Sequence, residues 1–197
     1  YGGYEGFKYR ATGANTYHHN LSTPDGEAQH SKFKQQSGSA FLSYDFTPHL
    51  TMGGLYEQFY SEILAGNRTS PEFFVDISPW ERKKTAVFAE IKDIASFLPR
   101  LRMDAFWQHN KKKMLNHVEM DVVTPAIAIS TRSDNRANNK NEQWGASLQS
   151  DWAIGENNYL ITGYEFNRDG LDAKSDSISD TTRKPNPFVT VKTLTDR

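Results

Sequence analysis

The sequence predicts an all-β fold, built as an antiparallel, up-and-down meander of long strands, and three observations lead to this prediction. Apolar and polar residues alternate with period two in many segments, whereas helical periodicity is hard to find. Only 37% of the 197 residues are hydrophobic, yet 13% are aromatic. The connections between the alternating segments switch regularly between short and long. These observations indicate strands with one apolar and one polar face, joined as successive hairpins.

The polar average and the aromatic content together distinguish two classes of chain. Mean hydropathy is −0.72, which a disordered chain would also show, but disordered chains are poor in aromatic residues. Strands of membrane barrels alternate lipid-facing apolar residues with polar lumen residues and carry aromatic girdles. No run approaches the ~20 apolar residues of a membrane-spanning helix. We therefore expect part of a transmembrane β-barrel of the bacterial outer membrane.

Charge and residue usage exclude several other functions. The chain has 23 basic and 24 acidic residues, a net charge of −1, which gives no reason to expect a nucleic-acid partner. It has no cysteine, which excludes disulfides and thiolate metal sites. Serine and histidine are plentiful, but no G-x-S-x-G motif is present. We expect no enzyme activity, no catalytic residue, no bound metal and no cofactor.

The first half of the chain contains three runs of period-two alternation. In the first, Phe7 and Tyr9 alternate with Lys8 and Arg10. A short turn at Pro48 joins the second run to the third, so that these two form a tight hairpin. The three predicted strands are 6–17, 39–46 and 50–60.

The second half contains runs of similar character. Between 100 and 110, Leu101 and Met103 alternate with Arg102 and Asp104. Short turns near Pro99 and Asn157 separate neighbouring runs, and we expect about eight strands in the whole chain. The predicted strands are 84–95, 100–110, 143–154 and 159–167, with weaker segments at 114–123 and 126–132 and the start of another at 188–191.

The long connections alternate with the short turns along the chain. They are 18–36, 61–83, 133–142 and 169–184. Outer-membrane barrels have short periplasmic turns and long extracellular loops, so we expect these four stretches to lie outside the cell. We interpret residues 1–197 as a fragment of a single β-barrel domain, either a piece of a larger protein or a partial gene product.

The alternation predicts which side chains meet lipid. A charge on the lipid face near the midplane costs ~2–4 kcal/mol, so the apolar set should face outward. That set is Tyr44, Leu101, Met103, Leu148 and Leu160, and the inward set is Lys8, Arg10, Asp45, Arg102, Asp104 and Gln149. The expected girdle residues are Trp80, Trp107, Trp144, Trp152, Tyr44, Tyr56, Tyr60, Tyr159 and Tyr164.

Three segments resemble the barrel of TonB-dependent receptors. They are DFTPHLT at 45–51, LPRLRMDAFWQ at 98–108, and WGASLQSDW at 144–152, which continues into YLITGYEF at 159–166. The resemblance implies a barrel of ~22 strands with a plugged lumen. It also implies uptake of a scarce nutrient, typically a ferric siderophore, haem or cobalamin, driven through TonB. Neither a plug nor a TonB box lies within residues 1–197, so coupling to TonB would act through a segment outside them.

The ligand of such a receptor is met first by the outer loops, because loops on a rigid scaffold carry binding. Phe73 and Phe74 could stack on a catecholate or a porphyrin plane. For haem, an axial ligand would come from His18, His19 or His30, although solvated loop histidines are the simpler interpretation. We favour a ferric siderophore over haem because no motif places a histidine.

Other sites and other functional classes remain open. Lys111, Lys112 and Lys113 would either meet anionic lipopolysaccharide or form a solvated charge run. Four aspartates between 169 and 180 could supply oxygen ligands to calcium, but their spacing does not match an EF-hand. The alternatives from other classes are a passive porin, an adhesin-type outer-membrane barrel, and a soluble β-barrel binding protein.

Overall fold

The chain forms one large antiparallel sheet and one small hairpin. The computed structural model describes residues 1–24, 26–67, 71–125 and 127–185, and these contain no helix, hence none able to cross a membrane. The strands are β1 (Gly2–Tyr4), β2 (Phe7–His18), β3 (Leu21–Thr23), β4 (Gly26–Ala28), β5 (Phe33–Thr47), β6 (Leu50–Asn67), β7 (Glu72–Ala95), β8 (Leu98–Val123), β9 (Ile127–Ile154) and β10 (Asn158–Pro185).

The large sheet has eight strands in the order β1-β2-β5-β6-β7-β8-β9-β10, and every neighbouring pair is antiparallel. The hairpin of β3 and β4 lies within the connection from β2 to β5. Strand length grows along the chain, from 12 residues in β2 to 28 in β9 and β10. The predicted all-β antiparallel meander is therefore confirmed, as is the predicted number of about eight strands.

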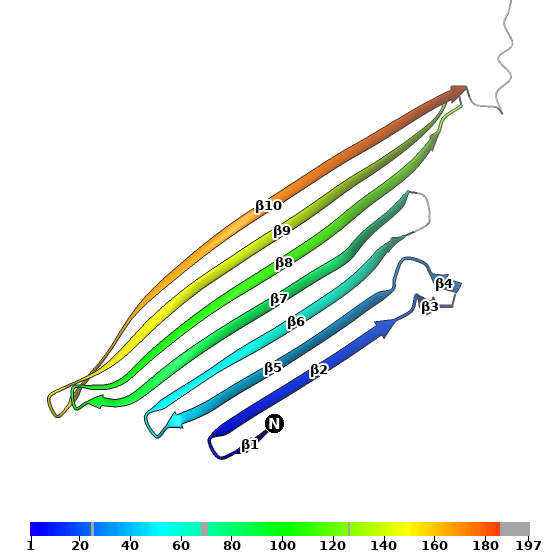
Figure 1. Cartoon of the computed structure of the whole chain (residues 1–197). Helices are drawn as coiled ribbons and strands as arrows, with labels where there is room; N and C mark the ends of the chain where they lie inside the picture. The colour runs from blue at the N-terminus through cyan, green and yellow to red at the C-terminus, as the bar shows by residue number, and fades with distance from the viewer. Residues whose placement is uncertain (25, 68–70, 126, 186–197) are drawn as a thin grey trace, which may run out of the picture.

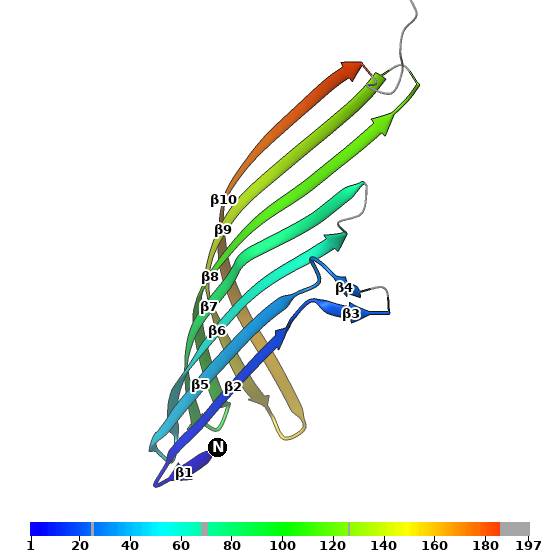
Figure 2. The same ribbon diagram turned by 90° about the vertical axis from the view of Figure 1, so that its right-hand side faces the viewer.

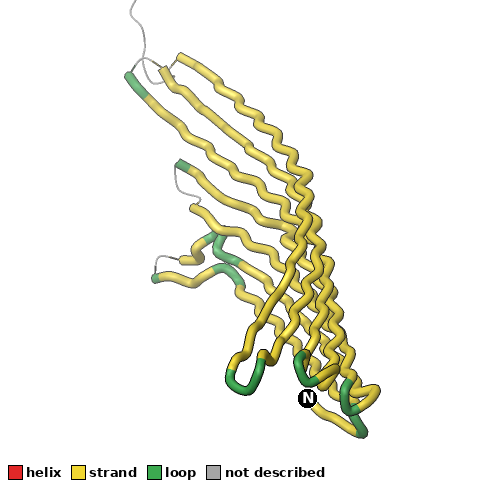
Figure 3. Tube along the Cα trace, turned by 90° about the vertical axis from the view of Figure 1, so that its left-hand side faces the viewer, coloured by secondary structure: helices red, strands yellow, loops and turns green. Residues whose placement is uncertain are grey.

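The sheet is strongly curved. The strands run side by side in chain order, with the tight turns gathered at one end and the longer strands reaching furthest at the other (Figure 1). Turned by 90°, the sheet is a trough whose two long edges, β2 and β10, stay apart (Figures 2 and 3). Within the described residues the sheet is thus an open segment with a convex and a concave face.

The three predicted short turns occur where expected. At the β5–β6 turn, the Thr47 hydroxyl oxygen accepts hydrogen bonds from the backbone amides of His49 and Leu50, at 3.2 and 3.0 Å. At the β9–β10 turn, Gly155 adopts φ +68°, a left-handed conformation that glycine enters without steric cost. The turn between β7 and β8 precedes Pro99, which itself lies in β8.

The prediction of four long loops is wrong for three of them. Residues 133–142 lie inside β9, 169–184 lie inside β10, and 61–83 mostly continue β6 and β7. The two stretches in β9 and β10 are mostly polar on both faces and so lack period-two hydrophobicity, yet their backbones pair with the adjacent strands in continuous register. The stretch 61–83 contains apolar residues, but bulges between Ser61 and Ile63 and between Ile77 and Trp80 interrupt its alternation. Only the stretch 18–36 contains a long connection, residues 19–32, and this connection holds the β3–β4 hairpin. The predicted run 188–191 lies outside the described residues.

The register places apolar side chains of seven strands in one row. Residues directly opposite one another in an antiparallel pair share a face of the sheet. Following these pairs from β2 to β10 gives Phe7, Tyr44, Met52, Ala89, Met103, Leu148 and Tyr164. The next row on the same face is Tyr9, Leu42, Gly54, Val87, Ala105, Ala146 and Phe166. An apolar band therefore crosses the sheet.

The opposite face is polar, and the predicted division into two faces is confirmed. The five residues expected to face outward share the apolar face, and the six expected to face inward share the other. The polar face is the more covered of the two, as expected for the concave side of a curved sheet: Ser43, Ser61 and Asp151, all buried, lie on it. Accordingly Met103 and Trp107 are both 44% exposed, whereas the alternate residues Arg102 and Asp104 are more covered.

Candidate functional site

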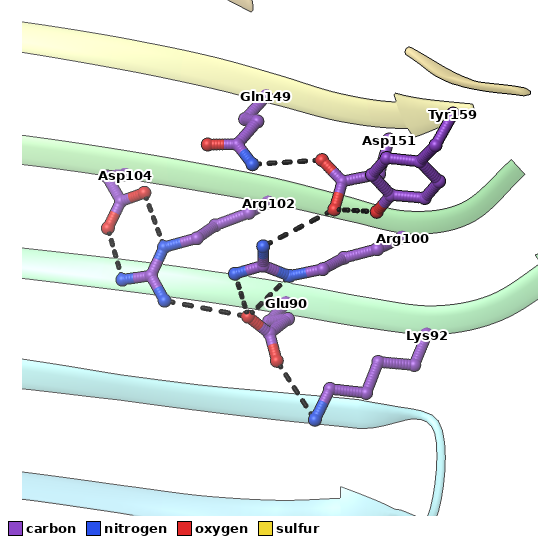
Figure 4. A network of polar contacts seen from close by, with 8 residues as sticks. All are labelled: Glu90, Lys92, Arg100, Arg102, Asp104, Gln149, Asp151 and Tyr159. Atoms are coloured by element: carbon purple, nitrogen blue, oxygen red, sulfur yellow. Dashed lines mark hydrogen bonds and ion pairs between the residues drawn. The ribbon is translucent and has the colours of Figure 1, made fainter. Parts of the chain in front are cut away.

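The concave face carries a group of charged side chains close to the tight-turn end of the sheet. It joins four adjacent strands, β7 to β10 (Figure 4). We call it the ionic network and define it as Glu90, Lys92, Arg100, Arg102, Asp104, Gln149, Asp151 and Tyr159. Three cations face three carboxylates, so its formal charge is balanced.

Glu90 is the acceptor at the centre of the network. Arg100 donates to its Oε2 through Nε at 3.0 Å and Nη2 at 2.7 Å, a charge-assisted arrangement that is stronger than a neutral hydrogen bond. Lys92 Nζ lies 3.1 Å from Glu90 Oε1, and Arg102 Nη1 lies 3.6 Å from Oε2. Arg102 also makes two parallel bonds to Asp104, at 2.9 and 2.8 Å. Each arginine is thus held by at least one carboxylate.

Asp151 connects the network to the edge strand β10. It is buried, with only 4% of its surface exposed. It accepts hydrogen bonds from Gln149 Nε2 at 2.9 Å and from the Tyr159 hydroxyl at 2.7 Å, and Arg100 Nη1 lies 3.5 Å away. A buried carboxylate with several donors is satisfied, so this end of the concave face is a closed, internally paired surface.

The convex face has aromatic side chains at the borders of its apolar band. Tyr56, Trp107 and Trp144 belong to one register row, and all three are between 42% and 45% exposed. Trp152 lies near the opposite border, where its indole nitrogen donates to Thr162 Oγ1 at 2.8 Å. Two predicted girdle residues are placed wrongly: Trp80 and Tyr159 face the concave side, where they bond Asn110 and Asp151. Trp80 follows the uninterrupted alternation of β7 from residue 80 to residue 92, which places it on the same face as Arg82 and Glu90.

The five residues expected to bind ligand do not converge on one position. His18 stacks on Phe33 with ring centroids 4.5 Å apart, and His19 meets Tyr17 edge-on at 4.5 Å. His30 instead stacks on Phe74 at 4.8 Å. Phe73 is 45% exposed at the start of β7. The role of these residues in ligand binding stays a prediction.

Phe74 lies between two histidines. The Phe74 ring stacks on His30, and it also stacks on His117 of β8, where the ring centroids of Phe74 and His117 lie 4.7 Å apart. His117 is only 5% exposed, and its Nδ1 lies 2.5 Å from Asp134 Oδ1 on β9. This hydrogen bond lowers the pKa of Asp134, and the positive charge of nearby Arg132 lowers it further. The column of three rings ties the β2–β5 connection to the outer part of the sheet.

No group of three or more potential metal ligands exists within residues 1–24, 26–67, 71–125 and 127–185. The four aspartates considered for calcium, Asp169, Asp172, Asp176 and Asp180, lie at intervals along β10 instead of in one loop. An extended strand spreads such residues over tens of ångströms. The described geometry therefore offers no calcium site there.

The comparisons with known proteins give little independent information. No family model matches the sequence, and no curated protein matches it. Among solved structures, one described as "Copper transporter OprC" is similar with a TM-score of 0.46 and 10% identity, over 92% of this chain and 38% of that one. The chain thus spans well under half the length of that protein.

Proposed function

We propose that the chain is part of the wall of a TonB-dependent outer-membrane transporter that takes up a ferric siderophore or a similar scarce nutrient. The observation that carries the membrane location is the apolar band of the convex face. Its two central rows hold no charged residue on any of the seven long strands. A face in contact with water would tolerate charged residues, whereas a charge in the hydrocarbon core of a bilayer is energetically unfavourable.

Two further features support a membrane wall. On β8 the convex side carries no polar side chain from Pro99 to Trp107, which reaches the lower end of the ~9–11 residues that a tilted strand needs to cross a bilayer. Aromatic rings with polar edges border the band, as expected at the level of lipid headgroups. The concave face is polar along the same strands, which suits the interior of a wide barrel.

Spin labels at Leu148 and Gln149 test the location directly. These neighbours on β9 should report opposite environments in lipid vesicles: oxygen should relax the label at 148, and a water-soluble nickel chelate the label at 149. Val87 and Phe88 provide a second pair on β7. Equal accessibility to the nickel chelate at both members of each pair would rule out the membrane wall.

We further propose that the ligand is taken up by active transport and not by passive diffusion. This part of the proposal is supported by the resemblance to TonB-dependent receptors. The test is growth of an iron-starved, receptor-deficient strain that carries the complete protein. Rescue by a ferric siderophore that depends on TonB is expected. Rescue that persists without TonB would instead indicate a porin.

Haem receives less support as the ligand. A haem iron needs an imidazole placed at one common position, whereas His18, His19 and His30 each contact a different aromatic ring and do not converge. If haem alone rescued growth, and alanine at these three histidines abolished that rescue, the siderophore preference would be wrong.

A further inference from the structure

A second group of side chains occupies the concave face further from the tight turns. It consists of Phe59, Trp80, Arg82, Asn110 and Lys112, and we call it the cation–aromatic cluster. On β8 it begins at Asn110, beyond the apolar segment that ends at Trp107. Its residues share the face of the ionic network, because Asn110 and Lys112 alternate in step with Arg102 and Asp104 along an uninterrupted β8–β9 pairing.

The contacts within the cluster are direct. Phe59 and Trp80 meet edge to face with ring centroids 5.3 Å apart. The Arg82 guanidinium lies 5.9 Å from the centroid of the Phe59 ring, and Lys112 Nζ lies 5.3 Å from that of Trp80. The Trp80 indole nitrogen donates to Asn110 Oδ1 at 3.1 Å. Two cations and two aromatic rings are thus presented together over β6, β7 and β8.

The two cations lack carboxylate partners. The register rows that contain them run from β2 to β10 without a single Asp or Glu: Ala14, Ser37, Phe59, Arg82, Asn110, Asn141 and Leu171 in one, and Thr16, Gln35, Ser61, Trp80, Lys112, Asn139 and Ala173 in the other. Among the described residues, no ion pair within 4.0 Å joins Arg82 or Lys112 to a carboxylate. Asn141 Oδ1, in the first row, is buried and has no hydrogen-bond partner.

Each element of this surface has a complementary chemical group. A guanidinium and an ammonium attract an oxyanion. Aromatic rings offer flat apolar area to a planar ring. An unpartnered amide oxygen accepts from a hydroxyl, and leaving it unpaired costs free energy that a ligand can recover. A single small molecule can satisfy the cations and the rings if its acidic oxygens are attached to a flat ring, and the amide oxygen as well if that ring also carries a hydroxyl group.

We propose that the cation–aromatic cluster is a binding site for an anionic ligand whose carboxylate or phenolate oxygens are attached to a planar ring. Arg82 and Lys112 bind the oxyanion, and Phe59 and Trp80 contact the ring. The proposal rests on the proposed transport function in one respect, because it places the binding site on the inner wall of a barrel through which the ligand passes. It assigns recognition to strand residues, not to His18, His19, His30, Phe73 or Phe74.

The test measures binding of 4-fluorobenzoate to the full chain by ¹⁹F NMR, relative to the same detergent without protein. Two matched probes separate its features: 4-fluorobenzyl alcohol has the ring without the charge, and fluoroacetate has the charge without the ring. Saturable binding is expected for 4-fluorobenzoate alone. Arg82→Gln and Lys112→Gln should each weaken it about tenfold, the effect of one lost charge-assisted hydrogen bond.

Lys84→Gln is the matched control. Lys84 lies one register row away on the same face, also over an aromatic ring, at 5.7 Å from Phe106, but its row contains a carboxylate, because its register partner on β6 is Glu57. Its replacement should leave binding unchanged within about twofold. Trp80→Leu, which keeps both cations, should weaken 4-fluorobenzoate and leave fluoroacetate as weak as before.

Three results would overturn the site: equal affinity for the neutral alcohol, equal weakening by Lys84→Gln, or no saturable binding by chain whose circular dichroism shows intact strands. The spin-label measurement at Leu148 and Gln149 fails or succeeds separately. Binding without the lipid pattern would remove the membrane wall and keep the site. The lipid pattern without binding would do the reverse.

Discussion

The positively charged side chains of the concave face have different partners in two regions of the same strands. In the ionic network, every arginine contacts a carboxylate, and Asp151 is 96% covered while it accepts three donors. In the cation–aromatic cluster, Arg82 and Lys112 lie over rings and no carboxylate shares their rows. A paired network holds strands together and presents little unmet charge. Cations over rings contribute less to stability but stay available to an anion.

The largest expected effect is loss of the central acceptor of the network. Glu90→Ala leaves Lys92, Arg100 and Arg102 close together without their shared carboxylate. We expect a loss of about 2–3 kcal/mol in the free energy of unfolding, below the 3–5 kcal/mol of a fully buried pair because Arg100 is partly exposed. Urea unfolding followed by tryptophan fluorescence measures it.

Glu165→Ala is the control for that variant. Glu165 lies on the same face but on the exposed strand β10, where its carboxylate accepts only from Asn167 Nδ2, at 2.6 Å. Its removal should change stability by less than about 0.5 kcal/mol. Equal losses for the two variants would mean that the network contributes no more than any surface carboxylate.

A smaller effect is expected in the cation–aromatic cluster. Arg82→Ala and Lys112→Ala each remove one cation–π contact, for which about 0.5–1 kcal/mol is typical at exposed sites. The same unfolding experiment should therefore place both variants well above Glu90→Ala in stability. A destabilisation as large as that of Glu90→Ala would show that these cations are structural, and the contrast between the two regions would disappear.

The smallest effect concerns the outer ends of the strands, where paired charge occurs again. The hydrogen bond from His117 lowers the pKa of Asp134 in the folded chain, so the ionised carboxylate stabilises the fold at neutral pH. This contribution is fully present above the ordinary aspartate pKa and is lost as pH falls through the lower, folded value. Wild-type chain should therefore exceed Asp134→Asn in stability at pH 7 and pH 5.

The difference in free energy of unfolding between the wild type and Asp134→Asn should disappear only at pH values below the ordinary pKa range of aspartate. A difference that vanished between pH 7 and pH 5 would mean that Asp134 is not the titrating group. His109 and Glu142 provide a comparison, since their side chains lie 3.4 Å apart on the same two strands and Glu142 is largely exposed. Glu142→Gln should have a smaller effect than Asp134→Asn at every pH.

The parts of the fold that were predictable from sequence are those in which one face is apolar. Leu101 and Met103 alternate with Arg102 and Asp104, and this period fixes both the strand and its two faces. The same logic fails between 133 and 142 and between 169 and 184, where both faces are polar. There the strands are held by backbone pairing with their neighbours, which leaves no mark on the pattern of side chains.

The site residues were harder to foresee, because the register brings them together. Phe59 and Trp80 are distant in sequence, and their contact depends on the register of β6 with β7, which pairs Phe59 with Arg82 and Ser61 with Trp80. One signal was present: Phe59 stands between Gln58 and Tyr60 on the side of β6 that also carries Glu57. An aromatic residue on a polar face has no lipid to meet, and so suggests a contact with another side chain or a ligand.

The steady lengthening of the strands gives the outer rim of the sheet a slope. β2 has 12 residues and β10 has 28, and the strand ends step outward in chain order (Figure 1). The wall of the sheet is therefore low beside β2 and high beside β10. A ligand that enters over the rim can thus contact a longer stretch of concave wall along β8, β9 and β10 than along β2.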